Sequence, residues 1–140
     1  RFELLAGRIT GKRVVLDYEI VENAPVYQGA LGDPNNTCGP PAHFSLYLQR
    51  RGDQMTAAFP YHRWFNRVGE LRDGRRTVSA LFDASWTGVF GQPNLPALQQ
   101  TLAEPANIGL TFGWGCFAGH GVNLASGAST FIIHSFRTSD

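Results

Sequence analysis

The strongest constraint on this chain lies in its last quarter, residues 108–137. Apolar residues at alternate positions, Ile108, Leu110 and Phe112, lead into a segment with four glycines, residues 113–121. A second run, residues 129–137, is rich in β-branched and aromatic side chains. Glycine allows tight turns and close approach of backbones, so two such runs around a glycine-rich loop predict two β-strands.

The same alternation predicts strands elsewhere. It is clearest over residues 43–50, where one face would be buried and the other would face water. The predicted inward set is Phe44, Leu46 and Leu48, and the predicted outward set is His43, Ser45, Tyr47 and Gln49. Further strands are predicted at residues 1–10, 13–21, 55–59, 61–66 and 77–83.

Turn residues separate these runs. Gly11-Lys12, Gly52-Asp53 and Asp73-Gly74 are typical of hairpins, and residues 22–41 form a predicted long loop without periodicity. In the last run both faces are apolar, which predicts a central strand covered on both sides.

These features predict an all-β fold, an antiparallel β-sandwich of jelly-roll-like form in a single domain, residues 1–140. One short helix is predicted at residues 94–104. Asn94 can cap it, Pro96 is tolerated in its first turn, and Pro105 ends it.

Charge and hydropathy exclude some functions. Only 16% of the residues are charged and the net charge is +1, so we expect no nucleic-acid partner. No run reaches the roughly 18 apolar residues of a membrane-spanning helix, so we expect no membrane span.

The two cysteines, Cys38 and Cys116, leave two interpretations open. A disulfide between them would stabilise the fold by about 4.5 kcal/mol on a chain-entropy argument and would indicate a secreted or periplasmic protein. Alternatively, they are two unrelated buried thiols of a cytosolic protein. The near absence of lysine beside frequent arginine favours a bacterial source.

Aromatic and planar polar residues suggest a sugar-binding face. Sugars are bound by rings that cover their C–H surface and by side chains that hydrogen-bond their hydroxyls. We expect Trp86 in the core, whereas Trp64 fits either the core or a binding face. The predicted binding residues are Tyr47, Arg63, Trp64 and Asn66, with His62 and Gln49 as second choices.

In its strand pattern the chain resembles the jelly-roll β-sandwich domains of lectins and carbohydrate-binding modules. The opening hairpin, the strand at residues 44–48, the Trp86 region and the closing strand at residues 131–136 carry this resemblance. It implies a secreted, non-catalytic module with a glycan or polysaccharide partner, and it assigns no functional residue.

Other functions stay open. Asp17 and Glu19 lie two apart on one strand face, about 7 Å apart, which suits the carboxylate pair of a small glycan hydrolase. A third candidate is a structural or assembly domain of the bacterial envelope.

Two loops contain residues suited to further chemistry. Cys116 and His120 share one loop and could form a nucleophile–base pair if Cys116 is not bridged. We expect no cofactor. Calcium is an alternative, because side-chain oxygen atoms in the loop at residues 33–36 could bind it, but the same residues also favour simple Asx-turns. Its candidate ligands are Asp33, Asn35 and Asn36.

Overall fold

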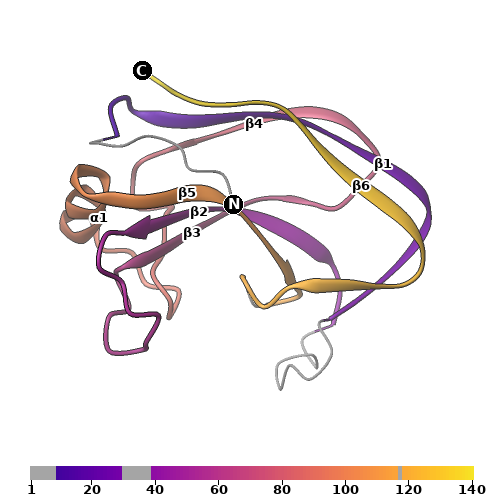
Figure 1. Ribbon diagram of the computed structural model, residues 1–140, viewed down its shortest axis with the longest axis horizontal. Coiled ribbons are helices and arrows are strands. Elements are labelled where there is room, and N and C mark those ends of the chain that lie inside the picture. Colours follow the sequence, from indigo (N-terminus) through magenta and orange to yellow (C-terminus); the bar gives the residue numbers. More distant parts are fainter. Residues whose placement is uncertain (1–8, 30–38, 117) are drawn as a thin grey trace.

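The computed structural model describes residues 9–29, 39–116 and 118–140, and most of them lie in β-strands (Figure 1). The strands are β1 Arg13–Gly29, β2 Ala42–Arg50, β3 Arg63–Glu70, β4 Gly74–Leu81, β5 Pro105–Trp114 and β6 Val122–Ser139.

Two antiparallel sheets of three strands make up the described part of the fold. One has the order β4-β1-β6 and the other β3-β2-β5, and the first lies above the second in Figure 1. The predicted all-β antiparallel sandwich is therefore confirmed.

The single predicted helix is also confirmed, as α1 Leu95–Ala103. The Asn94 side chain accepts a hydrogen bond from the Ala97 amide at 3.2 Å and so caps the first turn. Leu98 and Leu102 of this helix are buried against the sheets. Within the described part of the chain, no helix has the length and apolar character needed to cross a membrane.

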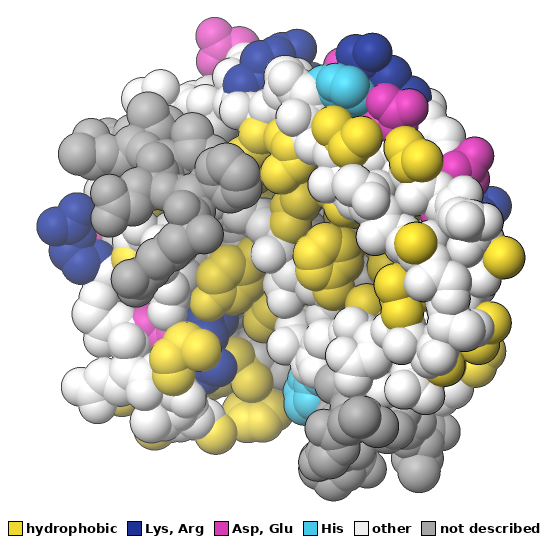
Figure 2. Space-filling model, turned by 45° about the vertical axis from the view of Figure 1, so that its right-hand side comes forward, with side chains coloured by type: hydrophobic (Ala, Val, Ile, Leu, Met, Phe, Trp, Pro, Cys, Tyr) yellow, Lys and Arg dark blue, Asp and Glu magenta, His cyan; other side chains and the backbone are white. Residues whose placement is uncertain are grey.

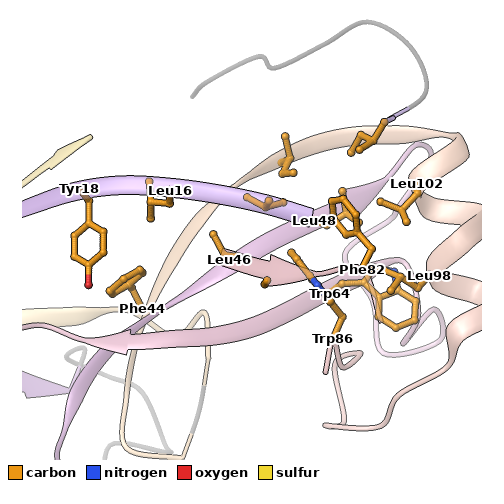
Figure 3. Packing of buried hydrophobic residues seen from close by; sticks show 14 of the residues in the cluster. Leu16, Tyr18, Phe44, Leu46, Leu48, Trp64, Phe82, Trp86, Leu98 and Leu102 are labelled. Atoms are coloured by element: carbon orange, nitrogen blue, oxygen red, sulfur yellow. The ribbon is translucent and has the colours of Figure 1, made fainter. Parts of the chain in front are cut away.

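The core lies between the sheets and follows the alternation of the strands. Leu16 and Tyr18 of β1 face Phe44 and Leu46 of β2, and all four are at most 1% exposed (Figure 3). The other end of the core is aromatic. There Trp64, Trp86 and Phe82 lie beside Leu98 and Leu102 of α1, with both indoles fully buried. The expectation that Trp86 belongs to the core is confirmed.

Strand β1 is longer than predicted, because residues 22–29 continue it rather than open a loop. They pair with β6 through register shifts, which break the alternation that marks a strand in a sequence. Beside the register shift between Asn23 and Val26, Gly127 of β6 has a φ of +77°, and a Cβ there would lie 2.2 Å from the Ala24 carbonyl oxygen. The remaining loop residues 30–38, and residues 1–8 of the predicted first strand, lie outside the described part.

Three other local predictions were wrong. Residues 55–59 form turns within the connection from β2 to β3. Asp73-Gly74 is not a hairpin: it links two sheets, because β3 pairs with β2 while β4 pairs with β1. Strand β6 is not central. Among the described strands it pairs with β1 alone, and Ile132 and Ile133 are each 36% exposed.

Candidate functional site

A pair of rings marks the outer face of the sheet β3-β2-β5. Tyr47 points away from the core because its neighbours Leu46 and Leu48 point inward. It stands opposite Phe65 of β3, and the two ring centroids are 5.5 Å apart at an interplanar angle of 53°. On the other side of Tyr47 lies Gly109, where an added Cβ would meet open space. The rings therefore have room above them.

These rings line a hollow of about 700 Å³, here called the outer groove. Its volume is within the usual range for small-molecule sites. Two connecting segments complete its walls, residues 87–91 and the described residues 116 and 118–120, and Phe90 is 65% exposed at its rim. The lining residues used below are Tyr47, Arg63, Phe65, Phe90, Thr111 and His120.

Arg63, in the lining of the outer groove, is held in place by two contacts. Its Nε lies 3.2 Å from Oδ2 of Asp53, whose side chain is fully buried, and its terminal nitrogen donates to the Thr56 carbonyl at 2.8 Å. A guanidinium has five N–H groups, so these contacts leave donors for a ligand. Fixed cations of this kind orient hydroxyl oxygens at little entropic cost.

Tyr47 contributes a neutral hydroxyl. Burial, and then the nearby Asp53 carboxylate, raise the pKa of Tyr47 to about 12. The phenol therefore stays protonated at neutral pH and can both donate and accept a hydrogen bond.

Only two of the six predicted sugar-binding residues, Tyr47 and Arg63, line the outer groove. The prediction for Trp64 was wrong. Its indole is 0% exposed and donates to Thr101 Oγ1 at 2.9 Å, so it cannot stack on a sugar. Asn66 is 8% exposed, lies in register with the inward Leu46, and donates to a Ser85 hydroxyl.

The two second choices also lie outside the groove lining. The His62 ring stacks on Phe59 with centroids 4.9 Å apart. The Gln49 amide donates to Asp53 at 2.9 Å and accepts from Asn107 at 2.6 Å, so both its ends are engaged. Gln49 thus positions the Asp53 carboxylate that pairs with Arg63.

Sequence reasoning missed Phe65 and Phe90. The signal for Phe65 was present, because it alternates with Trp64 and must face the opposite side of the strand. Phe90 lies in a turn without periodicity, and no sequence signal places it beside the rings.

A second, polar pocket of about 350 Å³ adjoins the outer groove and shares Phe65, Thr87, Cys116 and Ala118 with it. His43 and Ser45 line it, and they are 1% and 0% exposed although we expected both to face water. Neither imidazole nitrogen of His43 has a partner in good hydrogen-bond geometry among the described residues, although the nearby Gly115 backbone favours the protonated ring. Burial, and then the positive charge of Arg67, lower the pKa of His43 below its ordinary value of 6.5, so the neutral ring is favoured at pH 7.

The carboxylates of the hydrolase hypothesis lie on the other sheet. Asp17 pairs with Arg75 at 2.8 Å, and Glu19 pairs with His134 at 3.0 Å. The hydrogen bond from Arg75 lowers the pKa of Asp17. Both carboxylates are therefore engaged by neighbouring strands, and neither lines the hollows described above.

The remaining candidates concern loop residues. Cys116 and His120 both line the outer groove. Cys38 lies outside the described residues, so the Cys38–Cys116 disulfide stays a prediction. Asp33, Asn35 and Asn36 lie outside them as well, and the described residues contain no group of three His, Cys, Asp or Glu side chains that could hold a metal ion.

Comparison with known proteins identifies no relative of this chain. The chain matches no protein-family profile, no curated protein and no solved structure at a significant level.

Proposed function

We propose that the chain is a non-catalytic carbohydrate-binding domain that binds a glycan in the outer groove. The observation that carries this proposal is the accessible ring pair of Tyr47 and Phe65 beside the anchored guanidinium of Arg63. Phe90, at the rim, adds a third ring. Ring faces cover the C–H surface of a sugar, and Arg63 and Thr111 supply groups that hydrogen-bond its hydroxyls.

The decisive variant is Phe90→Ala, because the side chain is 65% exposed and its loss should leave the fold intact. Calorimetry across a panel of neutral oligosaccharides should identify a binder, and the variant should weaken its affinity by about tenfold through the lost ring contact. Tyr47→Phe keeps the ring and removes the hydroxyl, so it should weaken the same binder less.

Phe59→Ala is the matched control. Phe59 is also exposed, at 38%, but stacks on His62 and does not line the groove. Absence of binding to every sugar in the panel, or equal losses in Phe90→Ala and Phe59→Ala, would refute the proposal.

A second candidate, assembly with another protein, is supported by apolar side chains on the β1–β6 ribbon. Val21 and Val26 of β1 are 49% and 53% exposed, and Ile132 and Ile133 lie on the edge strand β6. Mass measured by light scattering over a dilution series tests it. A concentration-dependent mass that Val21→Asp abolishes would favour assembly, and a constant monomer mass would oppose it.

We also propose a secreted or periplasmic location, which rests on the predicted Cys38–Cys116 disulfide. Mass spectrometry of the unreduced protein should give a mass lower by two hydrogen atoms than that of the reduced protein. Equal masses would remove this argument.

A further inference from the structure

A third hollow, here called the edge hollow, lies between the two sheets where strands β5 and β6 run along their borders. Its volume is about 470 Å³, which is large enough for a small ligand. Figure 2 shows hydrophobic side chains gathered in the hollowed middle of this face. Both β5 and β6 are edge strands among the described strands, so no neighbouring strand closes the gap. Its described lining includes Tyr27, Leu71, Phe112, Val122, Ser129 and Phe131.

The walls of the edge hollow are mainly apolar, and none of its described lining residues carries a formal charge. Phe112 and Phe131 meet edge-on, with ring centroids 5.6 Å apart. Phe131 is also stacked on Tyr18, so the core fixes the position of this wall. A preformed apolar wall binds an apolar molecule without paying for much ordering.

Two polar groups of the edge hollow, those of Tyr27 and Ser129, have a defined direction of hydrogen bonding. The Tyr27 hydroxyl lies 2.6 Å from Glu22 Oε1 and 2.7 Å from Ser129 Oγ. An ionised carboxylate only accepts, so the single Tyr27 hydrogen goes to Glu22 and Ser129 donates its own hydrogen to Tyr27. Ser129 is left with free lone pairs, which accept from a ligand but cannot donate to it.

The charge of Glu22 restricts the ligand further. Its carboxylate stands one hydrogen bond behind the Ser129–Tyr27 pair, so an anionic head group placed there would be repelled. Burial, and then the hydrogen bond to Glu22, raise the pKa of Tyr27 to about 12, which agrees with a phenol that keeps its proton.

We propose that the edge hollow binds a small, uncharged, mainly apolar molecule whose hydroxyl or N–H group donates to Ser129. This site is distinct from the outer groove, although the two hollows share Leu110, Thr111 and Gly119. The two sites differ in charge, because Arg63 lines the outer groove whereas none of the described lining residues of the edge hollow carries a formal charge.

Three related probes test the head group: 4-phenylbutan-1-ol, its methyl ether and 4-phenylbutanoate. In titrations followed by NMR of the full chain, the alcohol should give saturable shifts at Phe112 and Phe131. It should bind about tenfold more tightly than the carboxylate and several-fold more tightly than the ether. Ser129→Ala should remove the preference for the alcohol over the ether and leave ether binding unchanged.

Val122→Trp fills the edge hollow and should abolish alcohol binding. Val26→Trp is the matched control, because Val26 is an exposed residue of the same ribbon outside the hollow lining, and it should bind as the wild type does. If Val122→Trp does not fold, Ser129→Ala decides the question. Shifts that do not saturate, a carboxylate that binds as tightly as the alcohol, or an alcohol preference that survives in Ser129→Ala would overturn the proposal.

Discussion

The two sheets present their outer faces to different surroundings. On β3-β2-β5, other segments stand over the sheet, so His43 and Ser45 are buried and a groove forms beside Tyr47. On β4-β1-β6, the outward Asp17 and Glu19 lie near the surface and pair with side chains of the neighbouring strands.

This difference shows what a strand pattern contains. Polar residues at alternate positions identify the face that points away from the core, and they did so on both sheets. They do not reveal whether water or another segment of the chain covers that face. A binding groove needs such a cover, so its position depends on loops that have no periodicity.

The largest expected effect on stability separates a side chain on the inner face of β3 from one at the rim of the outer groove. Trp64→Ala should lower the free energy of unfolding by about 3–5 kcal/mol, because it leaves a cavity in the core and removes the partner of Thr101. Phe90→Ala, at the rim of the groove, should change it by about 0.5 kcal/mol or less. Urea unfolding followed by circular dichroism measures both.

A milder variant guards this comparison against loss of folding. Trp64→Phe retains most of the core volume and should still be clearly less stable than Phe90→Ala. Equal losses for the substitutions at positions 64 and 90 would contradict the placement of the indole in the core.

Much of the fold could be predicted because local rules and tertiary packing agree. Phe44, Leu46 and Leu48 alternate without interruption, and Asn94 with Pro96 marks the start of the helix. The second half of β1 could not be found in this way. Its pairing with β6 includes bulges, and each bulge shifts the alternation by one residue.

The site was harder to predict than the fold. In the segment around Trp64, both faces of the strand carry rings, so composition alone does not show which ring is buried. The neighbouring helix decides it, because Thr101 accepts the indole hydrogen bond from a residue 37 positions away. Phe90 reaches the groove through a turn, and tertiary structure alone brings it there.

The next largest effect is a pH dependence of stability that arises from His43 on the covered outer face of β2. The folded state holds the pKa of His43 below its ordinary value of 6.5, chiefly through burial, so the unfolded chain binds a proton that the folded chain does not. The unfolding free energy should therefore be fully present above about pH 6.5 and fall by up to about 1.4 kcal/mol per pH unit below it, until the folded pKa is reached.

His43→Leu removes this titration and fills a similar space without the two buried ring nitrogens. Urea unfolding between pH 7 and pH 5 should show a smaller loss for the variant than for the wild type. Arg67 and Glu70 also influence His43, so the difference between the two proteins carries the test rather than either curve alone. Parallel curves would mean that water reaches the ring.

The smallest effect is expected on the uncovered face. The hydrogen bond from Arg75 lowers the pKa of Asp17, so this pair stabilises the fold above the ordinary carboxylate pKa and loses that contribution as the pH falls through the folded pKa. Because the pair is exposed, Asp17→Asn should lower stability only slightly at pH 7, and salt should reduce the difference. Arg75→Gln should act alike, and the double variant should lose no more than either single one. The same variants examine the hydrolase alternative, since a glycan hydrolysis activity lost in Asp17→Asn and Glu19→Gln would move the functional site to this face.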